Sequence, residues 1–353
     1  MSWSKLIMRL GAAVAAASLG LPAVAQKADT SLLNYDGPDR MKKIVQAAKK
    51  EGSLMLYTSL VEKNLQRLID PFEKKYGVKI NVWRAGQTRL LQRVVTEAKA
   101  GRFEVDALHF GSPELEALHR EKLLAPVQSP VLAELREGMV PEHREWAPTI
   151  LQVYVQAYNT NLVKKKDLPK SYEDLLDPKW KGKLGIEAKA WPWYATLVGS
   201  MGEEKGVKLF RDIANQSEIS VRQGTSLLNN MVAAGEVPLA LTIYSHMPLA
   251  AKRKGAPVDS FSIEPTIARA NGVAIAKHAK HPNAALLFYE YMLSSTEGQK
   301  IFASMDYVPT NTKVPSPLPP GMKLKLVEAT TVLDEVGKWN KLFDETFVKK
   351  DAP

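Results

Sequence analysis

Short apolar runs alternate with longer amphipathic segments from residue 39 to residue 120, and this alternation constrains the fold more than any other feature of the sequence. The links between the segments are only a few residues long. Strand–helix–strand units of this kind place successive strands parallel in one sheet, with the helices on its faces. The expected strands span residues 53–57, 78–83 and 105–110, and the expected helices span 39–51, 61–76, 87–100 and a segment from 112.

Local signals mark the ends of these elements. Gly52, Gly77 and Gly101 each follow an amphipathic segment, and glycine is favoured directly after a helix because it adopts positive φ without strain. Ser112 is a favoured N-cap residue and is followed by a proline and a glutamate, both of which suit a first helical turn. These signals predict a doubly wound α/β sheet in the first part of the chain.

A second series of elements follows a strand expected at residues 151–158, and the basic run at 164–166 reads as a solvated linker. Further strands are expected at 183–186, 219–221, 238–244 and 271–276. Further helices are expected at 194–201, 203–215, 225–234, 281–293 and 324–343, with a proline-rich loop at 315–320.

Length and composition narrow the class of protein. A chain of 353 residues is too long for one small core, which predicts two or three domains. The absence of cysteine excludes disulfides, thiolate zinc sites, iron–sulfur clusters and cysteine nucleophiles. The net charge of +10 suits a nucleic acid, an anionic membrane surface or an anionic ligand, and composition does not choose among them.

The first 25 residues carry the pattern of an export signal. Lys5 and Arg9 precede an uncharged, alanine-rich run that ends in Ala23-Val24-Ala25, the small-x-small pattern that signal peptidase cleaves. The run is short and weakly apolar for a membrane span of about 20 residues, so cleavage after Ala25 is preferred to an uncleaved anchor. We therefore expect a periplasmic protein exported through the general pathway, with a net charge of +8 after cleavage and no role in nucleic-acid binding.

Several blocks of sequence occur in the order typical of one family. They are Glu51–Ser59, Ile69–Gly77, Glu104–Ala107, Tyr158–Asn161, Tyr172–Lys183, and His281–Ala285 followed by Thr296–Lys300. Together they resemble the periplasmic solute-binding proteins of ABC importers, specifically the type II group that contains ferric-ion and polyamine binders.

The resemblance implies an α/β fold with two lobes, each a mainly parallel sheet flanked by helices. Two crossing strands would form the hinge, and the lobes would close on a ligand held in the cleft between them. The crossings are expected near residues 155–159 and 270–274. Residues 26–155 and 271–353 would then form a discontinuous first lobe, and residues 156–270 the second.

Polar loops follow several expected strands, and open α/β sheets bind ligands beyond the carboxyl ends of their strands. Helix N-termini there offer free N–H groups, and an arginine can hold a carboxylate or phosphate by two hydrogen bonds. The ordinary alternative is that these residues only cap helices. The predicted ligand-binding residues of these loops are Thr58, Ser59, Arg84, Gln87, Thr88, Ser112, Arg222, Thr225 and Ser226.

Three ring-bearing residues complete the predicted site. Trp193, before a second-lobe helix, either stacks on a planar ligand or covers a hydrophobic edge of the lobe. Tyr244 and His246 end a strand near the expected cleft. Ferric-binding relatives place adjacent tyrosines here, whereas this chain continues from Tyr244 with Ser245 and His246, which argues against iron.

We expect the ligand to be a small organic anion, such as a carboxylate or phosphonate, because the cleft loops carry arginines. Polyamine binding would need carboxylates there, and ferric iron remains the alternative. No metal and no cofactor is expected.

The sequence contains no Gly-x-Ser-x-Gly elbow, no His-Glu-x-x-His, no phosphate loop and no dinucleotide fingerprint, so no enzyme is expected. The predicted function is that of a monomeric binding protein that delivers its solute to an ABC permease in the inner membrane. A periplasmic hydrolase and a ligand sensor for a receptor kinase are the alternatives from other classes.

Overall fold

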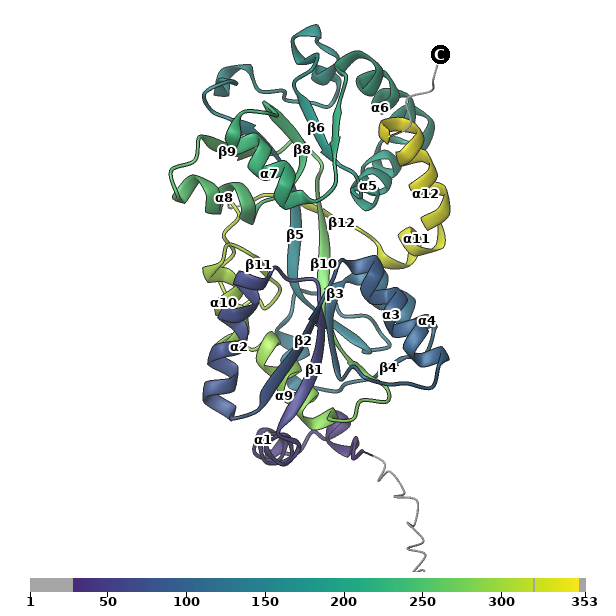
Figure 1. The fold of residues 1–353 in the computed structure, drawn as a ribbon, viewed down its shortest axis with the longest axis vertical. Helices are drawn as coiled ribbons and strands as arrows, with labels where there is room; N and C mark the ends of the chain where they lie inside the picture. Colours follow the sequence, from purple (N-terminus) through teal and green to yellow (C-terminus); the bar gives the residue numbers. More distant parts are fainter. Residues whose placement is uncertain (1–27, 320, 349–353) are drawn as a thin grey trace, which may run out of the picture.

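Two long strands, β5 (Trp146–Asn159) and β10 (Thr266–Ala276), run side by side through the middle of the molecule and connect its two lobes (Figure 1). The structure is a computed structural model that describes residues 28–319 and 321–348. The two strands pair antiparallel from Trp146 opposite Ala274 to Val153 opposite Ala268. The crossings expected from the sequence therefore fall inside two strands that begin earlier, at residues 146 and 266.

The first lobe is built on the parallel sheet that the sequence predicts. β1 (Ser53–Thr58) pairs parallel with β2 (Lys79–Arg84) and with β3 (Ala107–Gly111), and β3 pairs antiparallel with β10. The short strands β4 (Leu124–Ala125) and β11 (Val308–Pro309) join β10 and β5. The helices of this lobe are α1 (Arg40–Glu51), α2 (Glu62–Tyr76), α3 (Gln87–Lys99), α4 (Ser112–Arg120), α9 (Pro282–Leu293) and α10 (Gly298–Ser304).

The second lobe repeats this plan on the other half of the crossing strands. β8 (Leu239–Tyr244) pairs antiparallel with β5, and β6 (Leu184–Glu187) pairs parallel with both β8 and β7 (Ser220–Arg222). A further strand, β9 (Val258–Phe261), lies along the end of β5. The helices are α5 (Trp191–Met201), α6 (Glu203–Ser217), α7 (Thr225–Ala234) and α8 (His246–Arg253).

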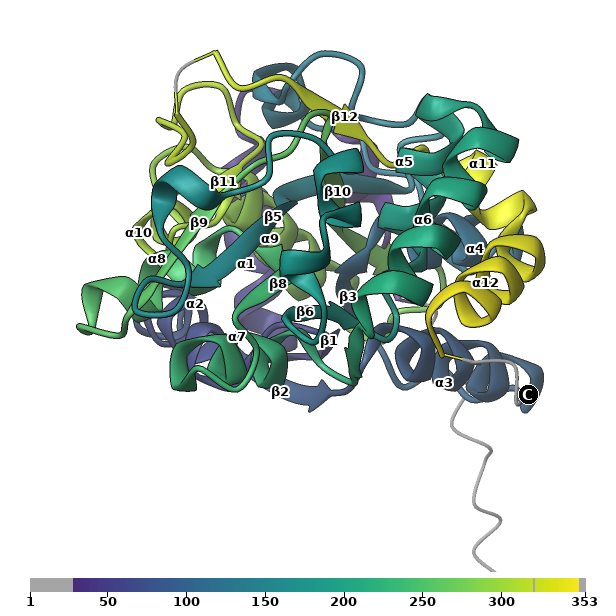
Figure 2. The same cartoon turned by 90° about the horizontal axis from the view of Figure 1, so that it is seen from above.

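The C-terminal segment differs from its prediction in both structure and position. Instead of one helix over residues 324–343, it forms β12 (Leu324–Leu326), α11 (Ala329–Asp334) and α12 (Val336–Phe343), because residues 324–326 add a parallel strand to β10. α12 lies beside α5 of the second lobe in both views (Figure 1, Figure 2). Phe343 packs its ring 5.8 Å from that of Tyr194, so this part of residues 271–353 joins the core of the second lobe and not that of the first.

Two sequence expectations concern the membrane and the N-terminus. The predicted signal peptide, residues 1–25, lies outside the described residues. Within residues 28–319 and 321–348, no helix has both the length and the apolar character needed to cross a bilayer.

A buried ion pair links the first and last long helices of the first lobe. Arg40 on α1 places Nη2 2.6 Å from Oε1 of Glu290 on α9, and the two side chains are only 6% and 9% exposed. The hydroxyl of Ser129 donates to the other carboxylate oxygen at 2.8 Å, and Arg40 also donates to the carbonyl of Leu32. The pair therefore ties α1 and the segment before it to the helix that returns after β10.

We expect Glu290→Ala to destabilise the protein by about 3–5 kcal/mol, because it leaves the Arg40 guanidinium buried without its partner. Unfolding in urea, followed by circular dichroism, measures the change. The matched control is Asp212→Ala, which breaks an exposed pair with Lys208 (2.7 Å, 75% and 40% exposed) and should cost at most about 0.5 kcal/mol. Equal losses in the two variants would contradict the assignment.

Candidate ligand-binding site

A cavity of about 600 Å³ lies between the two lobes, within the size range of small-molecule sites. The start of α2 lines it from the first lobe, and α7 and α8 line it from the second. Four of its lining residues are cationic, Lys63, Arg67, Arg253 and Lys254, and Asp306 is the one acidic residue among them. The cavity therefore attracts anions.

An ion pair crosses this cavity from one lobe to the other. Arg253, at the end of α8, donates from Nη1 to Oδ1 of Asp306 at 2.6 Å, in the turn after α10. Arg253 is 60% exposed, so the pair contributes at most about 1 kcal/mol and opening the lobes can break it at little cost.

Deeper between the lobes, polar side chains gather on one face of the crossing strands. Arg269 on β10 lies directly opposite Gln152 on β5, and Tyr154 lies directly opposite Tyr244 on β8. Because side chains of one strand alternate between faces, Gln152 and Tyr154 point to the same side. This face brings a cation, an amide and two phenols together where the sheets of the two lobes meet.

Arg269 is the centre of this cluster and is only 5% exposed. Its Nη2 donates to the hydroxyl of Tyr244 at 3.3 Å, and that hydroxyl lies 3.4 Å from the hydroxyl of Tyr154. Burial by itself lowers the pKa of Arg269, but the two tyrosines and two neighbouring carboxylates raise that pKa overall, so the guanidinium stays charged. Burial also raises the pKa of Tyr154 well above its ordinary value, so its phenol stays protonated.

The first turn of α4 faces the same cluster. Its Ser112 is 2% exposed, and both the Ser112 hydroxyl and Oε2 of Glu114 are buried without a hydrogen-bond partner among the described residues. Burial raises the pKa of Glu114, and the charge of Arg269 partly offsets that rise. A Cβ at Gly111 would lie 2.0 Å from Oε1 of Gln87 and 2.6 Å from Oε2 of Glu114, so these two side-chain ends would have to move to make room for it.

Glu187, at the end of β6, supports the cluster by fixing a loop. Its Oε1 accepts from the backbone N–H of Gly224 at 3.0 Å, and its Oε2 accepts from that of Lys189 at 2.7 Å. Gly224 has φ of +105°, a conformation that a residue with a side chain rarely adopts. Burial raises the pKa of Glu187, and these two hydrogen bonds lower it in part.

The structure brings some of the predicted site residues into the interlobe region. Ser226 and His246 line the large cavity, Tyr244 contacts Arg269, and Ser112 belongs to the buried cluster. Their role in binding stays a prediction.

Other predicted residues lie at the edges of this region or bond to the backbone. Thr58 is buried and its hydroxyl accepts from the N–H of Leu60, while Ser59 is half-buried. Gln87 accepts from the N–H of Gly111. Thr88 is exposed, and Thr225 is half-buried at the start of α7.

Three of the predicted residues are engaged elsewhere in the structure. The guanidinium of Arg84 donates to the carbonyl of Leu60, and that of Arg222 donates to the carbonyl of Val221. Trp193 is 1% exposed and packs its ring against those of Tyr172 and Phe210, which places it in the core of the second lobe.

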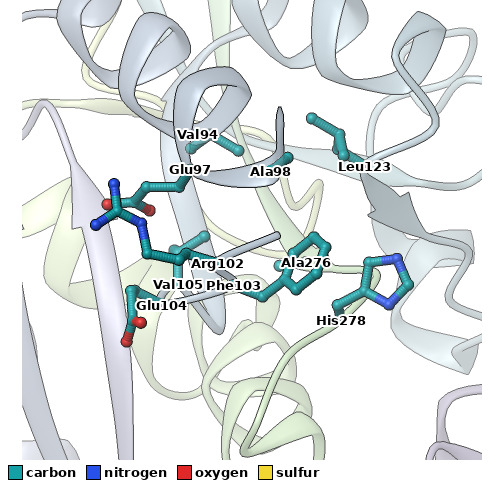
Figure 3. Close-up of a pocket in the computed structure, with 10 residues that line it drawn as sticks. All are labelled: Val94, Glu97, Ala98, Arg102, Phe103, Glu104, Val105, Leu123, Ala276 and His278. Atoms are coloured by element: carbon teal, nitrogen blue, oxygen red, sulfur yellow. The ribbon is translucent and has the colours of Figure 1, made fainter. Parts of the chain in front are cut away.

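Two further places hold chemistry-bearing side chains but no preformed site. A small cavity of about 20 Å³ beside Phe103 and His278, seen in Figure 3, has room for about one water molecule. Glu116, His119 and His143 place their ligand atoms within 4.8 Å of one another, yet the two imidazoles stack at 3.7 Å in nearly parallel planes. Lone pairs in parallel ring planes do not converge on one metal ion.

Comparison with known proteins gives the family. Residues 67–325 match the model of the bacterial extracellular solute-binding proteins. The Fe(3+)-binding periplasmic protein of Serratia marcescens is 28% identical over 205 residues, a match that covers 58% of this chain and 60% of that protein.

Solved structures agree with this match. The structure of iron-bound HitA from Pseudomonas aeruginosa superimposes with a TM-score of 0.73 at 23% identity, covering 83% of this chain and 99% of that one. The periplasmic binding protein AfuA from Actinobacillus pleuropneumoniae, with exogenous fructose-6-phosphate bound, gives a TM-score of 0.74 at 21% identity and covers 84% and 99%.

This chain is a bacterial extracellular solute-binding protein. The family and the superpositions confirm the predicted two-lobed, type II periplasmic binding fold. The members of this family are binding proteins, which confirms the prediction that the chain is not an enzyme.

Arg269, Gln152, Tyr154 and Glu114 of this solute-binding protein are absent from the predicted site. Three of them carry a signal in the sequence. Arg269 is the one charged residue in the otherwise uncharged strand 266–276, and Gln152 and Tyr154 recur at alternate positions of a strand that is buried throughout. A charge in such a strand is expensive unless a partner or a ligand satisfies it.

His246 adds a pH dependence to this site. Burial lowers its pKa to about 3, from an ordinary value of 6.5, so it is neutral beside Tyr307, whose ring lies 4.2 Å away. The unfolded chain takes up a proton below pH 6.5, whereas the folded protein does not until about pH 3. The stability that His246 contributes is therefore complete above pH 6.5 and is lost as the pH falls toward 3.

We expect His246→Gln to flatten the pH dependence of unfolding. From pH 6 to pH 5, the unfolding free energy of the wild type should fall by about 1 kcal/mol more than that of the variant. Urea unfolding at the two pH values measures this difference. Met247→Leu, a change in the same turn of α8 that keeps the imidazole, should follow the wild type; a flattened profile there, or none in His246→Gln, would contradict the assignment.

Proposed function

We propose that this protein is the periplasmic ligand-binding component of an ABC importer, and that it captures a small solute between its lobes for delivery to a membrane permease. The family match and the export signal support this function. The cavity lined from both lobes supports it too, since a ligand in contact with both lobes stabilises the closed arrangement.

The geometry favours a solute with an anionic group, and Arg269 carries this proposal. Its guanidinium is buried, its Nε has no hydrogen-bond partner, and no carboxylate within the described residues lies at ion-pair distance. An unpaired buried charge is costly, and a carboxylate or phosphate satisfies a guanidinium by two charge-assisted hydrogen bonds. The cationic lining of the neighbouring cavity would attract such a solute toward it.

Ferric iron is the second candidate, and the relatives support it more directly than they support an organic anion. The Serratia marcescens protein is described as Fe(3+)-binding, and HitA was solved with iron. The phenols of Tyr154 and Tyr244, 3.4 Å apart, with the carboxylate of Glu114 nearby, are hard oxygen donors of the kind that ferric iron prefers. In this alternative, Arg269 would hold an anion that accompanies the metal.

The two candidates differ in the ligand whose binding Arg269→Gln should remove. For an organic anion, wild-type protein at 100 times the dissociation constant should gain about 2.7 kcal/mol of stability, and the variant should lose the gain. Thermal shift and calorimetry with citrate, glycerol 3-phosphate, spermidine, and ferric chloride with and without citrate measure this. Arg211→Gln, on the outer face of α6 and 49% exposed, is the matched control and should behave as wild type.

The outcomes separate cleanly. Binding of a metal-free anion that Arg269→Gln abolishes supports the organic-anion importer. The ferric alternative is supported if the wild type binds only ferric iron, if this binding requires citrate, and if Arg269→Gln loses the citrate-dependent binding. Tight binding of spermidine, or of iron in both proteins without any anion, would rule out an anion site at Arg269.

A further inference from the structure

Several buried polar atoms around Arg269 lack hydrogen-bond partners, and they indicate which groups the ligand carries besides its charge. Five buried side-chain atoms with no hydrogen-bond partner among the described residues belong to neighbouring positions in this cluster: the hydroxyl of Ser112, Oε2 of Glu114, Oε1 of Gln152, Nε of Arg269 and Oδ1 of Asn271. Arg269 lies opposite Gln152, and Asn271 lies opposite Gly111, which directly precedes Ser112. Native proteins rarely leave buried polar atoms unpaired, so a group of five marks a place that something else completes.

Among these five atoms, Oε2 of Glu114 is the most informative. A serine hydroxyl donates or accepts, and an amide can present either its oxygen or its nitrogen after a flip, so those three residues suit many partners. Burial raises the pKa of Glu114 and the charge of Arg269 partly offsets that rise, but a carboxyl group keeps at least one oxygen that only accepts hydrogen bonds, whether it is ionised or protonated. A ligand made of acceptors alone would satisfy Arg269 but would leave that oxygen of Glu114 without a donor.

We propose that the solute of this protein carries a hydrogen-bond donor, an ammonium or a hydroxyl group, a few bonds away from its anionic group. Glu114 accepts a hydrogen bond from this donor, and Arg269 binds the anionic group. The inference rests on the proposed anion site and narrows its ligand to amino- or hydroxyl-bearing organic acids and phosphates. Glu114 lies in the first turn of α4, and Gly111, just before that turn, carries no side chain that would displace its carboxyl group.

Matched pairs of compounds test the inference on the full mature chain. The pairs are 2-aminoethylphosphonate with ethylphosphonate, β-alanine with propionate, and glycerol 3-phosphate with propyl phosphate. The members of the first two pairs differ in one amino group, and those of the third differ in two hydroxyl groups. We expect at least one donor-bearing member to bind at least about tenfold more tightly than its partner, as one charge-assisted hydrogen bond provides. Calorimetry gives the two dissociation constants.

Two variants assign the difference to Glu114. Glu114→Leu, which removes the acceptor, should reduce the preference within the pair to less than about threefold while the donor-free member binds no more weakly than before. Glu114→Gln keeps the shape and an amide oxygen, so it should retain part of a preference for hydroxyl and lose that for ammonium. Circular dichroism and thermal unfolding confirm that each variant is folded, and Glu114→Gln remains available if the leucine variant is not.

The results also separate this inference from the proposed function. If both members of every pair bind equally and Arg269→Gln abolishes both, the anion site stands and the role of Glu114 is wrong. If the preference persists in both Glu114 variants, another residue reads the donor and the inference is overturned. If none of the six compounds binds the wild type, the inference is overturned, while the organic-anion proposal is decided separately by the binding of metal-free citrate.

Discussion

The antiparallel pairing of β5 with β10 is the constraint on which the rest of this structure depends. Each strand is long enough to serve as a core strand in both lobes, so one pair of strands sets the sheet order of the first lobe through β3 and of the second through β8. The same pairing places Arg269 opposite Gln152 at the level where the lobes meet. The hinge and the polar cluster are therefore two consequences of one register. A shift of the β5–β10 pairing by one residue would move the Arg269 side chain to the other face of the sheet, into a hydrophobic core.

The cluster around Arg269 is an energetically unfavourable region within an otherwise well-packed molecule. Both lobes bury continuous apolar cores, whereas the surface between them buries one guanidinium, one unpartnered carboxylate oxygen and two phenols. Such groups destabilise a protein that holds no ligand, because their lost hydration is not replaced. A binding protein gains from this arrangement, since the ligand that supplies the missing partners then stabilises the closed state more than the open one.

The sequence predicts the elements of this fold far better than it predicts the site. Strands and helices such as β1, α7 and α4 follow from local signals: apolar periodicity, glycine after a helix, and a proline in its first turn. Long-range pairing has no such signal. Nothing near Arg269 in the chain shows that it faces Tyr244, and nothing near Trp193, which lies in the first turn of α5, shows that Phe210 packs against it. The two predicted arginines, Arg84 and Arg222, donate to backbone carbonyls, and their role in binding stays a prediction.

Contacts on the two sides of the cleft determine how readily it opens. On one side, Arg253 pairs with Asp306; on the other, α11 touches α4 and Asp334 pairs with Arg120, while α12 is anchored in the second lobe (Figure 1). Arg120 is 41% exposed and Arg253 is 60% exposed, so each pair adds at most about 1 kcal/mol to closure. Contacts this weak hold the lobes together without locking them, and a ligand with a modest preference for the closed form is then enough to shift the equilibrium. The selectivity of closure must therefore come from the buried cluster, where an imperfect ligand leaves charges unpaired, and not from the exposed pairs that any closed form makes equally well.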